Sequence, residues 1–245
     1  MKRLLRLIAL AAIALSALAQ RTPRTLSFAS DFQTVPVMAN TTGVSGVVFQ
    51  TYVAILNPTS TAFPVNVSLY DAAGAKHDAV ITLAAGEQKT YPNFLDAVFH
   101  ATGGGAVTFR SDTPANRFVV SAEVWSNGSR YGTSIPALEF AGTDSPSFTA
   151  GITVGANART NVGCFNQSGA PNSIRASIRD ASGIMTLGSV TLDLAPHAWG
   201  QTALSTIVSG GYVEFEPSDT AVCYAVVVDN STNDGRFISA AEYRP

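Results

Sequence analysis

Residues 50–60 read QTYVAILNPTS, and residues 159–169 read RTNVGCFNQSG, which is nearly the same phrase 109 positions later. At this offset, residues 51–74 pair with residues 160–183 without a gap. Identical residues in the two copies include Thr51 and Thr160, Asn57 and Asn166, Asp71 and Asp180, and Gly74 and Gly183. The pairing predicts that one structural unit occurs twice in the chain.

A second pair of segments repeats at a different offset. Residues 119–139 pair with residues 222–242 at an offset of 103, again without a gap. The matches include Val119 with Val222, Asn127 with Asn230, and Ile135 with Ile238. Because the two blocks keep their order and differ only in the loops between them, the chain is predicted to be a tandem of one fold.

Each copy shows the alternation of half-buried β-strands. In the segment VNVSLYD, Val65, Val67 and Leu69 fall on one face of a strand. Turn residues that recur roughly every 8 to 12 positions indicate a two-sheet sandwich of immunoglobulin-like type. Residues 93–100 favour one short helix, capped by Asn93. The predicted fold class is all-β, with two tandem immunoglobulin-like antiparallel β-sandwich domains after a signal peptide.

The first residues have the pattern of a secretory signal peptide. Three basic residues within residues 2–6 precede an apolar run over residues 7–15, and residues 17–19 have the small-x-small pattern of a cleavage site. A membrane anchor is the alternative, but the run is shorter than the ~20 residues that a spanning helix needs. We expect cleavage after Ala19, a secreted, periplasmic or extracellular protein, and no transmembrane segment after signal removal.

Composition narrows the classes of partner. The chain has 245 residues, a formal net charge of −2 and only 13% charged residues. A mildly acidic chain lacks the basic surface that phosphate-backbone binding requires, so no nucleic acid is expected. The expected partner is an extracellular protein or polysaccharide whose identity the sequence does not reveal.

The segment between the two copies is rich in turn residues. Gly142, Asp144 and Pro146 lie close together in it, which is typical of a linker. The predicted parts of the chain are a signal peptide (1–19), a flexible lead-in (20–34), a first sandwich domain (35–140), a linker (141–147) and a second sandwich domain (148–245).

Several motifs resemble those of a known family. They are VPVMANTTGVSG before QTYVAILNPTSTA, then GGAVTFRSDTP, SRYGTSIPA, ARTNVGCFNQSGAP and VVVDNSTNDGRFISA. The chain resembles secreted, largely uncharacterised proteins of environmental bacteria built from tandem immunoglobulin-like repeats. That family usually has apolar residues where this chain has Cys164 and Cys223. The resemblance implies the fold and the export, but no activity.

Both cysteines fall on repeated positions. Cys164 takes the place of Ile55, and Cys223 takes the place of Val120. In an immunoglobulin-like domain these positions are expected on the second and sixth strands, which face each other across the core. Export supplies an oxidising compartment, so we predict a Cys164–Cys223 disulfide between the two sheets. Two buried free thiols are the alternative.

The sequence offers few candidates for catalysis. His77, His100 and His197 lie in separate predicted turns, with no paired histidine and no acid expected to orient them. No nucleophile-elbow, phosphate-loop or metalloprotease motif occurs. We therefore predict no enzymatic activity, no catalytic residue, no cofactor and no metal ligand.

Two acidic segments leave a calcium site open as an alternative. Glu214 and Glu216 share one strand face with Asp219 just beyond, but they are more simply the solvated face of a strand. The oxygen-rich segment from Asp229 to Asp234 is interpreted as a hairpin turn, because its counterpart in the first copy is the turn-like segment SNGSRYG.

Aromatic residues leave a carbohydrate platform open. The candidates are Trp125, Tyr131, Trp199, Tyr91 and Phe94, of which Trp199 is expected in a loop and Trp125 near an exposed strand end. The leading hypothesis is a non-enzymatic exported binding or structural protein that acts at or outside the cell surface. The alternatives are a carbohydrate-binding module and a secreted hydrolase with a site between the domains. A pocket that gathers Glu214, Glu216, Asp219 and a histidine would favour the hydrolase.

Overall fold

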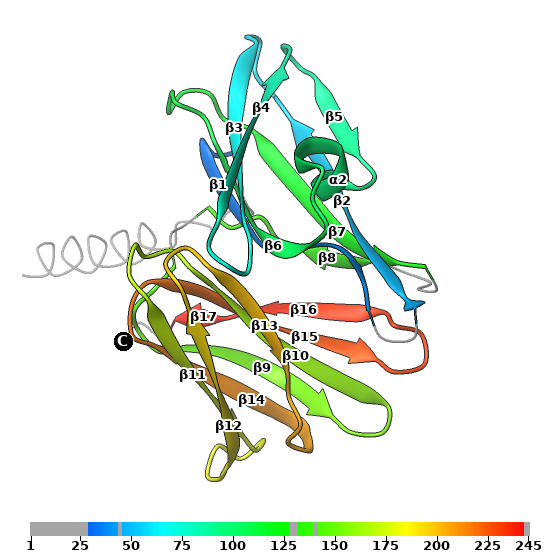
Figure 1. The fold of residues 1–245 in the computed structure, drawn as a ribbon, viewed down its shortest axis with the longest axis vertical. Helices are drawn as coiled ribbons and strands as arrows, with labels where there is room; N and C mark the ends of the chain where they lie inside the picture. The colour runs from blue at the N-terminus through cyan, green and yellow to red at the C-terminus, as the bar shows by residue number, and fades with distance from the viewer. Residues whose placement is uncertain (1–28, 44–45, 128–131, 140–141, 243–245) are drawn as a thin grey trace, which may run out of the picture.

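A computed structural model describes residues 29–43, 46–127, 132–139 and 142–242 (Figure 1). Its regular structure is almost entirely β-strand, and the ladders between its named strands are antiparallel. The predicted all-β class, built from antiparallel sandwiches, is confirmed. The predicted signal peptide lies outside the described residues.

The first half contains one continuous sheet that forms both layers of its sandwich. Its elements are β1 (Phe32–Thr42), β2 (Val48–Leu56), β3 (Phe63–Tyr70), β4 (Lys76–Leu83), β5 (Gln88–Tyr91), α2 (Phe94–Phe99), β6 (Gly103–Arg110), β7 (Val119–Ser126) and β8 (Thr133–Ile135). The strand order is β4-β3-β6-β1-β2-β7-β8, with β5 beside β2. Strand β1 joins two layers, because residues 32–40 pair with β6 while residues 40–42 pair with β2.

The second half repeats this arrangement in two separate sheets. Its strands are β9 (Ser147–Val154), β10 (Ala158–Asn166), β11 (Asn172–Arg179), β12 (Thr186–Leu194), β13 (Trp199–Ala203), β14 (Val208–Pro217), β15 (Ala221–Asp229), β16 (Gly235–Ser239) and β17 (Ala241–Glu242). One sheet has the order β13-β10-β15-β16, and the other has the order β12-β11-β14-β9-β17. A separate apolar core fills each half.

The ladders of the two halves match at the offsets of the sequence repeat. Ile55 on β2 lies opposite Val120 on β7. The corresponding positions are Cys164 on β10 and Cys223 on β15, which also lie opposite each other. The pairing of β3 with β6 corresponds to that of β11 with β14, although β6 and β14 lie outside the repeated blocks. The repeated blocks therefore fall on equivalent strands of the two sandwiches.

The repeated phrase places the same buried threonine in each half. The Thr51 hydroxyl accepts a hydrogen bond from the Ala39 amide at 2.7 Å and donates to its carbonyl at 3.2 Å. Thr160 makes the same two contacts with Thr153, at 3.3 and 2.6 Å. Each hydroxyl thus ties the second strand of its half to the first.

The repeated asparagine holds the loop that follows the same strand. The Asn57 amide donates to the carbonyl oxygens of Thr61 and Ala84, both at 2.8 Å. Asn166 makes the same two bonds at 2.8 Å, to carbonyls 4 and 29 residues further along the chain. Both side chains are fully buried. Because a buried amide must be hydrogen-bonded, the loop conformation is set by this residue in both halves.

The structure moves one predicted boundary and refines another element. Strand β1 begins at Phe32, so the last residues of the predicted lead-in 20–34 belong to the sandwich. Gln33 is buried there, and its side-chain amide donates to the Phe118 carbonyl at 2.9 Å. The sequence did not predict this burial, because a polar residue at the start of a strand is usually exposed. The short helix is present as α2, and Asn93 occupies its N-cap position but makes no side-chain cap bond.

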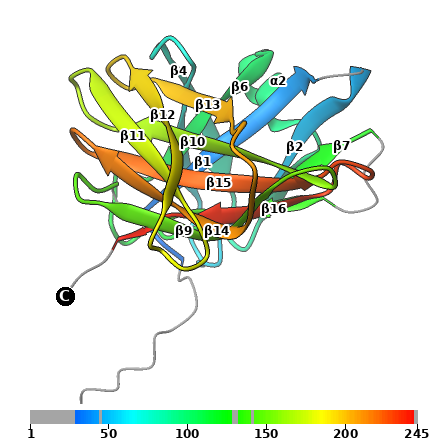
Figure 2. The same cartoon turned by 90° about the horizontal axis from the view of Figure 1, so that it is seen from below.

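The two halves pack through one sheet of the second half. Strand β16 contacts β8, β15 contacts β1, and β13 contacts β6. Seen from the second half, β15 and β16 run across the molecule with β1, β2 and β7 behind them (Figure 2). The sheet β13-β10-β15-β16 is therefore covered on both faces, by its own core and by the first half.

Candidate functional site

Tyr224 fastens the second half to the first. Its side chain comes from β15, is 0% exposed, and belongs to the apolar core of the first half. The Trp199 indole donates to the Tyr224 hydroxyl at 3.0 Å, and that hydroxyl donates to Gln201 Oε1 at 3.0 Å. Burial raises the pKa of Tyr224, so the phenol keeps the proton that it donates. Phe237 stacks on the ring at a centroid distance of 5.1 Å.

A hairpin turn of the first half makes the second contact. The Trp199 amide donates to the Asp71 carbonyl at 3.0 Å. The Tyr70 ring lies 5.1 Å from that of Phe165 and 5.9 Å from that of His197. The two halves are therefore joined both through a core residue and through a hairpin turn.

A cleft of about 870 Å³ lies between the halves. Its wall on the first half is mostly apolar and includes Val37, Met38, Phe49, Val124 and Ile135. A ligand cleft of this kind is largely apolar, with a few polar groups that orient the ligand.

The opposite wall of the cleft carries a guanidinium and several side-chain amides. Trp199 and Val226 line it together with Arg159, Asn161 and Gln201. Among the described residues that line the cleft there is no aspartate, glutamate, histidine, lysine or cysteine. The guanidinium of Arg159 and the amides of Asn161 and Gln201 can form hydrogen bonds with a ligand, so this wall is suited to binding.

The oxygen-rich segment from Asp229 to Asp234 is the hairpin between β15 and β16, as predicted. The Asp229 carboxylate accepts bonds from the Ser231 amide at 2.7 Å and the Ser231 hydroxyl at 2.5 Å. These bonds, the hydroxyl first, lower the pKa of Asp229. The carboxylate therefore stabilises the turn.

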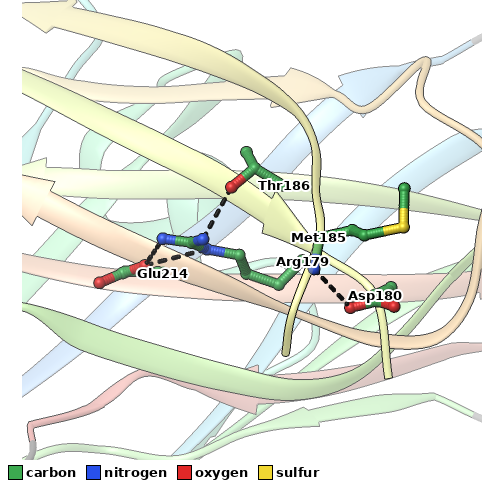
Figure 3. A network of polar contacts seen from close by, with 5 residues as sticks. All are labelled: Arg179, Asp180, Met185, Thr186 and Glu214. Atoms are coloured by element: carbon green, nitrogen blue, oxygen red, sulfur yellow. Dashed lines mark hydrogen bonds and ion pairs between the residues drawn. The ribbon is translucent and has the colours of Figure 1, made fainter. Parts of the chain in front are cut away.

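The second acidic segment has its two glutamates on the face of β14 opposite the core, where Glu216 is exposed and Glu214 is partly exposed. Figure 3 shows Glu214 with its partner Arg179. Arg179 donates to Glu214 Oε2 from Nη2 at 2.7 Å and to Thr186 Oγ1 from Nη1 at 2.7 Å. Val213 and Phe215 point into the core with no exposed surface. Within the described ranges, no group of three or more His, Cys, Asp or Glu side chains is placed to hold a metal ion.

His77 lies on β4, where a turn was predicted, and it has an acidic neighbour that its position in the sequence did not indicate. His77 Nε2 lies 3.4 Å from Asp71 Oδ2, across the hairpin between β3 and β4. Both side chains are exposed, so the pair is a surface contact. His100 ends α2 in a left-handed conformation, with φ of 51°.

A second groove, of about 720 Å³, is also lined by residues of both halves and includes His197, Lys76 and Asp78. Asp78 accepts bonds from Ser68 and Lys76, which lower its pKa, so it holds no proton to donate near neutral pH. A hydrolase site was expected to gather a histidine with Glu214, Glu216 and Asp219. None of these three acidic residues is among the described residues that line this groove.

The predicted disulfide Cys164–Cys223 is present, but its place differs from the expectation. The cysteines are direct partners on the neighbouring strands β10 and β15, with a Cα–Cα distance of 4.1 Å. The prediction of a bond across the core was wrong because it assumed the strand order of immunoglobulin domains. Here β10 pairs directly with β15, and the two strands between them in the chain, β11 and β14, pair with each other in the other sheet. Both cysteines therefore lie in one sheet.

The aromatic candidates divide between surface, interface and core. Trp125 is 42% exposed on β7, as expected. Trp199 opens β13 at the interface, where the sequence suggested a loop. Phe94 is buried in the first core and meets Tyr91 edge-on at 5.3 Å. Tyr131 lies outside the described residues.

Comparison with known proteins adds no assignment: no family model matches the chain, and no curated protein does. In the part of the chain that the structure describes, no helix has the length and apolar character needed to cross a membrane.

Proposed function

We propose that the chain is a non-enzymatic exported protein that binds or organises a partner at or outside the cell surface. Two sandwich units, residues 35–140 and 148–245 joined by 141–147, would arise by duplication of one unit. The matching ladders and the shared buried Thr and Asn contacts support this origin. The disulfide supports export, because such bonds persist in oxidising compartments.

The observation that carries a binding function is the cleft between the halves. It combines a defined volume, a mostly apolar wall from the first half, and a guanidinium and side-chain amides from the second half. The proposed activity is therefore ligand binding at a fixed interface between two sandwiches.

Filling the cleft tests this function. Ala203 lines the cleft and is exposed, so Ala203→Trp should block it, whereas Ala97→Trp on the exposed face of α2 should not. Thermal-shift screening against small molecules should give ligands that stabilise the wild type and Ala97→Trp but not Ala203→Trp. Ligands that stabilise all three proteins equally would place binding elsewhere. Turnover of ester, glycoside, peptide or phosphate substrates would contradict the non-enzymatic assignment.

Export is tested separately. The mass of the protein recovered outside the cytoplasm should correspond to a chain that starts at Gln20. Recovery of the intact chain in the membrane fraction would contradict the signal-peptide assignment.

Carbohydrate binding is the second candidate, and the open face of β2 and β7 favours it. Trp125 is exposed there, and Tyr52 lies on the same face, because Tyr52 is opposite Glu123 and Gln50 is opposite Trp125. Aromatic rings beside amide and carboxylate groups are suited to a sugar ring. A polysaccharide pull-down that Trp125→Ala abolishes would support this function, and one that it leaves unchanged would exclude this face.

A further inference from the structure

Arg159 is a cation in the cleft without a carboxylate partner among the described residues. A guanidinium has five N–H donors. Two of them are used, from Nη1 to Asn230 Oδ1 at 3.1 Å and from Nη2 to Asn233 Oδ1 at 3.0 Å. The others have no acceptor within the described part of the chain. The equivalent position in the first half is Gln50, so the cation is a feature of the second half alone.

The hairpin holds this guanidinium in place. Asn230 Nδ2 donates to the Ala156 carbonyl at 3.0 Å, which turns its Oδ1 toward Arg159. Asn233 adopts a left-handed conformation, with φ of 60°, and offers its Oδ1 to the other end of the guanidinium. The amide oxygens that suggested a calcium loop in the sequence thus bind the side-chain cation. A group held in this way loses little conformational entropy when a ligand arrives.

The other residues that line the cleft indicate the polarity of the rest of the ligand. Phe49, Val124 and Val226 give an apolar surface, and no described lining residue carries a negative charge. We propose that the cleft binds a small amphipathic anion, whose carboxylate or sulfonate pairs with Arg159 and whose apolar body contacts these walls. The proposal rests on the proposed binding function of the cleft and adds the chemical class of the ligand. An arginine fork suits an oxyanion, because two parallel N–H bonds reach its two oxygens.

Two fluorescent probes with a common aromatic body test the charge. 8-Anilinonaphthalene-1-sulfonate carries a sulfonate, and N-phenyl-1-naphthylamine is its uncharged counterpart. Both should bind the wild type and be excluded by Ala203→Trp. Arg159→Gln should weaken the sulfonate probe by about tenfold, the effect of one lost charge-assisted hydrogen bond. It should leave the neutral probe unchanged, which also shows that the variant is folded.

Matched variants separate the charge of Arg159 from charge elsewhere. Arg159→Lys should keep part of the affinity for the sulfonate probe, and Arg175→Gln on the exposed face of β11 should keep all of it. Equal binding of the sulfonate probe to the wild type and Arg159→Gln, or equal loss of both probes, would overturn the anion proposal while the cleft remains a binding site. Failure of both probes to bind the wild type would overturn the anion proposal together with the binding function of the cleft.

Discussion

Strands β7 and β15 occupy equivalent places in the two halves but have different surroundings. On β7, Ser121 and Trp125 point to solvent. On β15, the equivalent residues are Tyr224 and Val228, and both are buried. The sequence of β15 is apolar over residues 221–228, as expected for a strand covered on both faces, whereas β7 alternates.

This difference explains why the outer sheet face of the second half is docked while the matching face of the first half is open to solvent. In the second half, Trp199, Tyr224 and Phe237 make the outer face of the sheet suitable for packing on a neighbour. The first half has Gln88, Ser121 and Ser134 at the matching register positions, and these side chains are exposed. One backbone arrangement therefore serves as a docked face in one half and as an open face in the other.

Exchanging the central residue of the two faces should have the largest effect. Tyr224→Ser gives the second half the residue of the first, leaves a cavity in the first core and removes the partner of the Trp199 indole. Unfolding free energy should fall by about 3–5 kcal/mol, as for other large-to-small core substitutions. The reverse change, Ser121→Tyr, should stay within about 0.5 kcal/mol, because the site is exposed. Equal effects in urea unfolding would contradict the contrast between the faces.

The disulfide should give the next largest difference. Replacing the pair with the residues of the first half, Cys164→Ile with Cys223→Val, keeps an apolar pair and removes the cross-link. Stability should fall by about 2–4 kcal/mol in the chain-entropy account of a disulfide. The converse double variant, Ile55→Cys with Val120→Cys, should form a bond in the first half, since the register is the same. Free thiols in that variant after oxidative refolding would show that the registers differ.

The buried threonines should behave alike. Thr51→Val and Thr160→Val each leave a backbone amide and carbonyl without the hydroxyl that pairs with them. Each should cost about 1–2 kcal/mol, the range for a lost buried hydrogen bond. Thr82→Val on the exposed face of β4 is the control and should be nearly neutral. A large cost in one half only would argue against equivalent strands.

The smallest effect should be a pH dependence shared by the two hairpin turns. Burial raises the pKa of Asp71, but bonds from the Ala75 and Ala73 amides and from His77 outweigh it, so the pKa lies below 3.8. The Ser182 hydroxyl and the Met185 amide lower the pKa of Asp180 in the same way.

Each of these carboxylates contributes stability that is complete above the ordinary pKa of 3.8 and is lost as the pH falls through the lower folded-state value. Asp71→Asn and Asp180→Asn should therefore be slightly less stable than the wild type at neutral pH and equal to it in strong acid. A difference that grows in acid would have the wrong sign.

The sequence was sufficient for some of these features and not for others. Periodicity and the two offsets predicted the all-β class, the strand alternation and the pairing of Cys164 with Cys223. They did not reveal which face of a strand meets another sandwich, because Tyr224 is equally compatible with a core or a surface. Arg159 was missed for a similar reason, since its role depends on two amides more than 70 residues away.

Hydroxyl-radical footprinting of the intact protein tests the central claim most directly, with each residue's oxidation rate divided by its rate in the unfolded chain. Tyr224 is 0% exposed and Trp125 is 42% exposed, so Tyr224 should be strongly protected while Trp125 is readily oxidised. Similar normalised rates for Tyr224 and Trp125 would contradict the account, because they would show that the outer face of β15 is as open to solvent as that of β7.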